Sequence, residues 1–274
     1  MIGRTDLVQK VLRGLGGMLF LGIGYPLVEA TWCRVVRQTV RLRNLPDSFR
    51  GTSIALVTDV HHGPWVPLYY VERVVRMVMN TKPDLICLGG DYVHMHPRYI
   101  EPCIAALGAL SSRHGVYAVL GNHDHWEGAE ATRRALAENH IQELTNCGVW
   151  IRENDARIRL AGLDDLWEGS PDLQAALGDA DTRDAVILLA HNPDTVERFS
   201  DPRLGLVLSG HTHGGQVNLP FIGAPLVPSK FDHKYLWGLV QKGQTQIFVS
   251  RGVGTITPPI RFRCRPEVSL ITLT

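Results

Sequence analysis

Five short apolar runs along this chain each end in a turn that carries polar side chains. The runs cover residues 54–57, 85–88, 116–120, 186–190 and 206–208, and glycines stand in or beside most of the turns. Uninterrupted apolar runs of this length are typical of buried strands in a parallel sheet. The loops after such strands gather at one edge of an α/β fold, where ligands bind. The pattern therefore predicts an α/β fold with one polar site at that edge.

The turns after these runs supply a chemically specific set of donors. Carboxylate, imidazole and amide groups are present without a thiolate, which favours Mn, Fe, Zn or Co, with Mn preferred here. A tetrahedral ion uses four ligands, so this many donors predict two ions, an arrangement that serves phosphate-ester hydrolysis. The polar side chains at these strand ends are Asp59, His61, Asp91, Asn122, His123, His191, His211 and His213, and Asp91 is the best candidate for a bridge between two ions.

Helices and further strands are expected between these runs. Valines recur at helical spacing over residues 68–80, and Ala and Leu share one face over residues 129–140, so both segments are expected to be helices. Residues 36–45 alternate with a period near two and lead into 52–59, which predicts two strands paired as in a hairpin. With no repeat or long linker, residues 33–274 are expected to form one catalytic domain.

Composition excludes some partners. A formal net charge of +1 and the absence of a Lys/Arg run argue against a dedicated nucleic-acid partner. The five cysteines are scattered, with no C-x-x-C pair, so they predict core residues in a reducing compartment rather than a disulfide framework. Nothing in the sequence implies an obligate protein partner.

The N-terminal segment is uncharged from Gly14 to Val28 and has basic residues on both sides. We interpret residues 1–32 as a membrane anchor or a segment lying in the membrane interface. A cleaved signal peptide and a buried N-terminal helix are the alternatives. The unpaired cysteines and the arginines after the segment favour the cytoplasmic face of the inner membrane.

The ordered motifs D-x-H, G-D, G-N-H-D, a lone H and G-H-T-H resemble those of the calcineurin-like metallophosphoesterase superfamily, over residues 53–217. The resemblance implies a four-layer α/β-β/α sandwich with a dinuclear site at one edge. It further implies that one ion is held by Asp59, His61, Asp91 and His213, and the other by Asp91, Asn122, His191 and His211. His123 would then stay outside both shells and act as general acid or phosphate ligand.

One position departs from a related pattern. Protein phosphatases of this superfamily read G-D-x-V-D-R-G, whereas this chain reads "GDYVHMHP", with His94 at the second Asp and Met95 at the Arg. A protein phosphatase activity is therefore not expected. The residue that orients His123 is left open between Asp124 and His94.

The hydrophobic N-terminus, "TDVHHG", "GHTHGGQ" and the C-terminal tail are similar to a membrane-associated bacterial phosphodiesterase branch. This resemblance implies a phosphate-containing substrate at a membrane surface. Lipid-linked pyrophosphates such as UDP-2,3-diacylglucosamine are substrates of this kind. Arg251 is a candidate phosphate ligand. Arg261, Arg263 and Arg265 are expected instead to face water from a strand.

Two function classes follow from these motifs. The first is a phosphohydrolase, of lipid-linked or of soluble substrates; the second is a metal-binding scaffold without turnover. A scaffold is expected to lack ligands or the equivalent of His123, and all are present here, so the sequence favours the enzyme.

Overall fold

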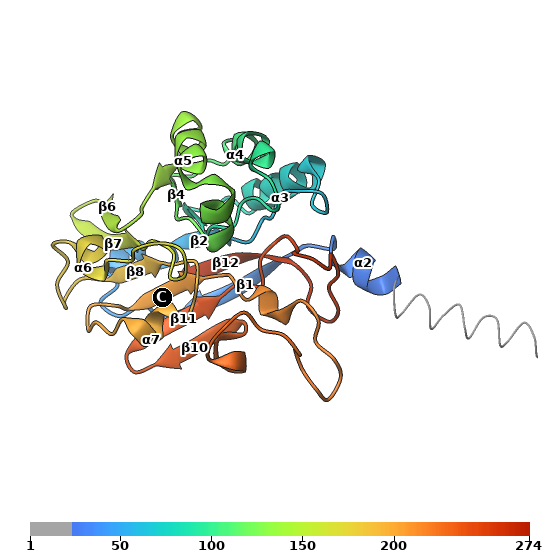
Figure 1. Cartoon of the computed structure of the whole chain (residues 1–274). Coiled ribbons are helices and arrows are strands. Elements are labelled where there is room, and N and C mark those ends of the chain that lie inside the picture. The colour runs from blue at the N-terminus through green and yellow to red at the C-terminus, as the bar shows by residue number, and fades with distance from the viewer. Residues whose placement is uncertain (1–23) are drawn as a thin grey trace, which may run out of the picture.

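Two six-stranded sheets pack face to face and carry helices on their outer faces in the computed structural model, which describes residues 24–274 (Figure 1). The predicted four-layer α/β-β/α sandwich is confirmed. The first sheet runs β1 (Arg34–Val40), β12 (Glu267–Leu273), β2 (Ser53–Val57), β3 (Leu85–Leu88), β4 (Val116–Ala118) and β5 (Gln142–Glu143). The second runs β10 (Gly238–Lys242), β11 (Thr245–Val249), β9 (Leu206–Ser209), β8 (Val186–Leu189), β7 (Ala156–Gly162) and β6 (Cys147–Glu153).

The central strands are apolar along their whole length because both of their faces are covered. In β3, Leu85 and Cys87 pack against the other sheet, whereas Ile86 and Leu88 pack under helices. The helices over the first sheet are α3 (Leu68–Asn80), α4 (Ile100–Leu107) and α5 (Asn122–Glu138). Short helices α6 (Leu173–Leu177) and α7 (Thr195–Arg198) cover the second sheet.

The two predicted helices are present, and the second begins earlier than expected. Helix α3 has the predicted bounds and buries its valine stripe. Helix α5 starts at Asn122 and is interrupted at Gly128, whose φ of 140° and ψ of 83° are not helical. The predicted segment thus corresponds to the part after the interruption, and the extra first part brings Asn122 and His123 into the helix.

The expected hairpin between the first two strands is wrong. Strand β12, from the C-terminus, lies between β1 and β2, parallel to β1 and antiparallel to β2. Alternation along β1 reports which side chains face the core, but it does not report which strand is the neighbour.

The described chain begins beside the C-terminal loop. Helix α2 (Tyr25–Glu29) ends in a buried Glu29, whose carboxylate accepts hydrogen bonds from the backbone N–H groups of Arg263 (3.0 Å) and Cys264 (2.6 Å). Among residues 24–274, no helix is long and apolar enough to cross a membrane. Most of the predicted anchor, residues 1–23, lies outside the described residues.

Candidate metal centre

All seven predicted metal ligands lie at one edge of the sandwich, just beyond the carboxyl ends of strands. Strands β2, β3 and β4 lead to the donors from the first sheet, and β8 and β9 lead to those from the second. All seven side chains are buried: Asp59, His61, Asp91, Asn122, His191, His211 and His213.

Six of these side chains form two clusters that meet at Asp91. In the first cluster, His61 Nε2 lies 3.0 Å from His213 Nε2, which lies 3.5 Å from Asp59 Oδ1. In the second, His191 Nε2 lies 3.2 Å from Asp91 Oδ2 and 3.1 Å from His211 Nδ1.

The same Asp91 Oδ2 lies 3.5 Å from His61 Nε2, in the first cluster. One carboxylate oxygen therefore faces both groups of ligands. This is the position that a bridging ligand occupies in a two-metal site.

Asn122 supplies an independent test of whether these residues fit a metal. Its Oδ1 atom is buried and has no hydrogen-bond partner among the described residues. A buried amide oxygen left without a partner costs about 1–3 kcal/mol, so such atoms call for an explanation. A divalent cation beside the second cluster would satisfy it, and the donor set therefore fits metal binding.

Hydrogen bonds outside the two clusters aim the ligand atoms. His191 Nδ1 lies 2.8 Å from the carbonyl oxygen of Gly89, so a proton on Nδ1 leaves Nε2 free to face the centre. The Asp59 carboxylate accepts from Thr58 Oγ1 at 2.8 Å and from the His211 backbone N–H at 2.9 Å. The latter bond joins the two sheets.

The backbone is left-handed at most of these ligands. The φ angles are 55° at Asp59, 49° at His61, 56° at Asp91, 69° at His211 and 52° at His213. Residues other than glycine rarely adopt such angles, and they cluster at functional sites where the surrounding structure enforces them.

Close packing around the ligands explains two of the glycines. A Cβ atom at Gly121 would lie 2.3 Å from Asp91 Oδ1, and one at Gly210 would lie 2.2 Å from Asp59 Oδ2. Any larger residue at either position would displace a predicted ligand.

Burial sets the protonation of most of the imidazoles. It lowers the pKa of His61 and His213 well below the ordinary value and that of His211 to about 3, so these rings are neutral and offer lone pairs. Burial opposes the shift of His191, but the neighbouring Asp91 raises the pKa of His191 to about 10. Metal binding must therefore displace a proton from His191.

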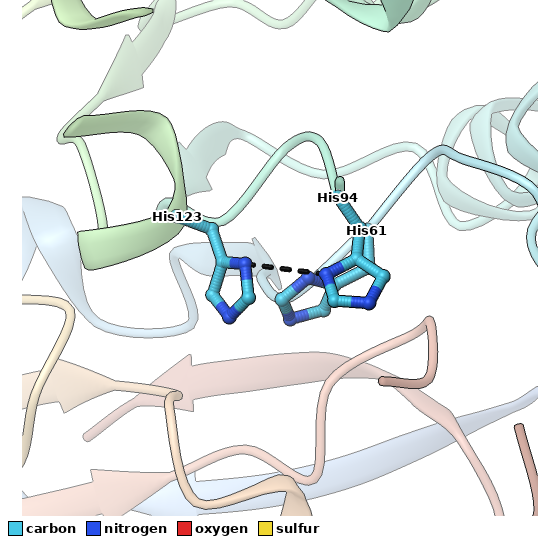
Figure 2. Close-up of side chains that lie close together, drawn as sticks. All are labelled: His61, His94 and His123. Carbon is cyan, nitrogen blue, oxygen red and sulfur yellow. Dashed lines mark hydrogen bonds between the residues drawn. The ribbon is translucent and has the colours of Figure 1, made fainter. Parts of the chain in front are cut away.

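His123 stands beside the ligands at the start of α5, with His94 next to it (Figure 2). Their Nδ1 atoms lie 3.3 Å apart, and His94 Nε2 lies 3.5 Å from Thr257 Oγ1. The exposed Trp126 packs its ring against His123, with centroids 4.6 Å apart. Burial and the neighbouring His123 lower the pKa of His94 to about 4, so His94 is neutral.

Asp124 has a different task from orienting His123. Its carboxylate accepts the backbone N–H groups of Asp91 (2.7 Å), Tyr92 (2.9 Å) and Gly121 (2.9 Å). It thereby ties the loop after β3 to the loop after β4. Of the two residues that the sequence left open, only His94 contacts the His123 ring.

Sequence reasoning missed a further polar turn, after β7. His125 Nε2 lies 3.1 Å from Asp164 Oδ1, which links the start of α5 to this turn. Asp165 accepts the backbone N–H of Trp167 at 2.9 Å, and the Trp167 ring lies edge-on to His211 at 4.3 Å. The signal was available, because "AGLDD" ends a strand in acidic residues as the other runs do.

The three arginines expected on a strand near the C-terminus, Arg261, Arg263 and Arg265, lie instead in the loop before β12, where Arg263 is exposed and Arg265 is half-buried. Arg261 is fully buried in a loop, so its expected exposure on a strand is wrong. Its guanidinium donates to the carbonyl oxygens of Gly254 (2.7 Å) and Cys264 (3.1 Å), which compensate the buried charge. Arg251 pairs with Glu267 at 2.8 Å and stacks on Trp237. Its phosphate-binding role stays a prediction.

Two clusters of buried carboxylate and imidazole groups, joined by one aspartate at the edge of this sandwich, define the class of dinuclear metallophosphoesterases. The model of the calcineurin-like phosphoesterase family matches residues 52–215. The chain belongs to this family and is a metal-dependent phosphoesterase.

Three relatives illustrate the likeness. The uncharacterized metallophosphoesterase YkuE of Bacillus subtilis is 32% identical over 284 residues, which cover 97% of this chain and 96% of the relative. The phosphodiesterase YaeI of Escherichia coli is 33% identical over 268 residues, 92% of this chain and 93% of the relative. A bovine transmembrane protein with a metallophosphoesterase domain is 33% identical over 251 residues, 85% of this chain and 55% of the relative.

Proposed function

We propose that this enzyme is a phosphodiesterase or pyrophosphohydrolase of a lipid-linked substrate, such as UDP-2,3-diacylglucosamine, at the cytoplasmic face of the inner membrane. Mn is the favoured ion at both positions. The names of two relatives support parts of the proposal: YaeI is called a phosphodiesterase, and the bovine relative is called a transmembrane protein. The uncharged stretch from Gly14 to Val28 supports the membrane half.

The observation that carries the proposal is an apolar cavity beside the metal ligands. It has a volume of about 460 Å³ and reaches from His213 to the loop of residues 217–228. Val217, Leu226, Val227 and Ile256 are among the residues that line it. A cavity of this size and polarity suits the hydrocarbon part of an amphiphilic phosphoester, whose phosphate would lie at the metal centre.

The chain's own residues divide the catalytic work. Two bound ions would supply Lewis-acid activation of water and of the phosphoryl oxygens. Asp59, His61, Asp91 and His213 would hold one ion, and Asp91, Asn122, His191 and His211 the other.

His123 acts as the general acid in this proposal, because its ring stands beside the clusters and is surplus to both. As an imidazolium it donates Nδ1–H to His94 Nδ1, which directs its Nε2–H away from His94 and toward a leaving oxygen. His94 is neutral and therefore accepts this bond without competing for the proton. The His94 proton then lies on Nε2, toward Thr257 Oγ1.

The test compares substrates on protein that is stripped of metal and reloaded with Mn, Fe, Zn or Co singly. The substrates are bis(p-nitrophenyl) phosphate, p-nitrophenyl phosphate and UDP-2,3-diacylglucosamine in mixed micelles. We expect the diester to be cleaved faster than the monoester, and the lipid-linked pyrophosphate to be cleaved as well. A preference for the monoester, with no cleavage of the pyrophosphate, would leave a general phosphatase of soluble substrates as the better account.

A pair of variants tests the cavity itself. Leu226→Ser changes a residue that lines it, whereas Leu239→Ser changes an exposed residue on β10 that does not. We expect Leu226→Ser to raise KM for the lipid-linked substrate only, with the soluble diester unaffected. Equal effects of the two variants would show that the cavity does not receive the hydrocarbon.

A further inference from the structure

The loop between β9 and β10 exposes large apolar side chains at its tip. Phe221 is fully exposed, and Ile222 and Leu226 are 70% and 80% exposed. Two backbone hydrogen bonds between Leu219 and Gly223, of 2.8 and 2.9 Å, close the chain into a tight turn that holds the tip outward. Exposed apolar side chains gathered in this way mark an interaction surface.

This tip lies at the same end of the molecule as α2, where the described chain begins (Figure 1). The two are connected through the C-terminal loop. The backbone N–H of Asn218 donates to the carbonyl oxygen of Phe262 at 2.8 Å, and the Phe262 ring contacts Tyr25 of α2 with centroids 6.0 Å apart. Helix α2 exposes two further apolar side chains, Leu27 and Val28, at 47% and 52%.

The charge around this end suits a negatively charged lipid surface. Residues 202–231, which include the loop, contain no Asp or Glu. Lys230 is exposed just after the loop, Arg263 is exposed next to Phe262 in the C-terminal loop, and Arg265 stacks on the exposed Trp32 at 4.0 Å. Apolar side chains flanked by basic ones and by an interfacial tryptophan are typical of segments that lie in the headgroup region of anionic bilayers.

We propose that the loop of residues 217–228 inserts Phe221 and Ile222 into an anionic bilayer, as a membrane contact separate from residues 1–23. The inner side of the same loop lines the cavity that ends at His213, and Leu226 belongs to both surfaces. Insertion therefore brings the mouth of that cavity to the lipid, so that an amphiphile can pass from bilayer to metal centre without crossing water.

Fluorescence of a probe at the loop tip tests this proposal on the full chain. Ile222→Cys is labelled with an environment-sensitive dye in a Cys147→Ser background, because Cys147 is exposed and the other four cysteines are buried. Asn154→Cys, in the exposed turn between β6 and β7, carries the dye as the matched control. The protein is mixed with vesicles of phosphatidylethanolamine and phosphatidylglycerol, with and without spin-labelled acyl chains.

We expect the dye at position 222 to shift to shorter wavelength and to be quenched by the spin labels, whereas the dye at 154 does neither. The variant Phe221→Ser/Ile222→Ser should hydrolyse bis(p-nitrophenyl) phosphate at the wild-type rate, which shows that it folds. Its retention on the vesicles in high salt should fall by about tenfold or more, because both substitutions remove apolar surface that the bilayer would bury.

Vesicle-bound protein with an unquenched dye at position 222 would overturn the proposal. A wavelength shift that depends on protein concentration and needs no vesicles would overturn it in favour of a second copy of the chain on this surface. Neither result concerns the diesterase activity, which is assayed on a soluble substrate, so a failure here is distinguishable from a failure of the proposed function.

Discussion

The hydrogen bond between His94 and His123 gives a quantitative prediction about catalysis. At 3.3 Å and half-buried, it is an ordinary or weak bond, worth about 1 kcal/mol. If its effect is to hold His123 in place, losing it in His94→Ala should lower kcat by about fivefold. Removing the acid itself, in His123→Ala, should lower kcat by about 10²–10⁴.

The double variant separates positioning from an independent role. Because His94 acts through His123, the change His94→Ala should have almost no further effect in the His123→Ala background. The assay is kcat on two diesters, one that releases p-nitrophenolate and one that releases an alkoxide, with metal content measured in every variant. The losses should be smaller for p-nitrophenolate, because a weakly basic leaving group needs little protonation.

The pH profile gives a readout that a merely structural role would not change. Burial lowers the pKa of His123, so the fraction of protein that carries the acid falls early as pH rises. His94→Asp places a carboxylate at the acceptor position, which should raise the pKa of His123 and extend activity to higher pH. Additive losses in the double variant, or an unchanged profile in His94→Asp, would refute the reasoning.

Three further predictions concern the metals and the loops that hold them. Asp91→Asn should lower the content of both ions, because Asp91 faces both clusters, whereas His213→Ala should empty mainly one. Elemental analysis after metal supplementation measures the ions per chain, and the same loss in both variants would contradict the bridging position of Asp91. Asp124→Ala leaves three buried N–H groups without an acceptor, so the free energy of unfolding in urea should fall by about 3 kcal/mol or more; a loss under about 1 kcal/mol would mean that the loops do not depend on this carboxylate. The hydrogen bond that His125 donates to Asp164 raises the pKa of His125, and, against the effect of burial, the same bond lowers the pKa of Asp164 to about 2. Both groups are charged between about pH 4 and pH 6.5, so the ion pair stabilises the folded protein fully in this range. This contribution to the free energy of unfolding falls at higher pH as His125 loses its proton, and it falls toward pH 2 as Asp164 gains one. The melting-temperature difference between wild type and His125→Ala should follow this window, and a difference that stays constant up to about pH 9 would count against the pair.

The parts of the fold that could be predicted are those that depend on the sequence of one continuous segment. Strand β3 reads LICL because one face packs on the other sheet and one under helices, and α3 shows its valine stripe directly in the sequence. The insertion of β12 between β1 and β2 could not be predicted, because the pairing joins residues near both ends of the chain. Local alternation is compatible with any neighbour, and packing of the whole sheet selects one.

The same contrast between local sequence and long-range contacts explains which residues of the site could be predicted from the sequence and which could not. The donors were predictable because each stands at the end of an apolar run, and the structure brings all seven to one edge. The buried position of Arg261 was not, because its acceptors are carbonyl oxygens that only the folded loops supply. The task of Asp124 was hidden for a similar reason, since two of its three partners lie more than thirty residues away.

The contacts between donors explain why the motifs keep no fixed spacing along the chain and still define one site. His211 donates its backbone N–H to Asp59, and the His191 ring bonds the carbonyl of Gly89, so the second sheet's loops are held directly by the first sheet's loops. Neither half presents the complete set of ligands alone. The backbone is left-handed at most of the donors, which indicates that the loops do not adopt this conformation without the surrounding structure. The packed sheets therefore determine the geometry of the centre, and bound ions would in turn join the two sheets, so that metal affinity and folding stability are coupled in this enzyme.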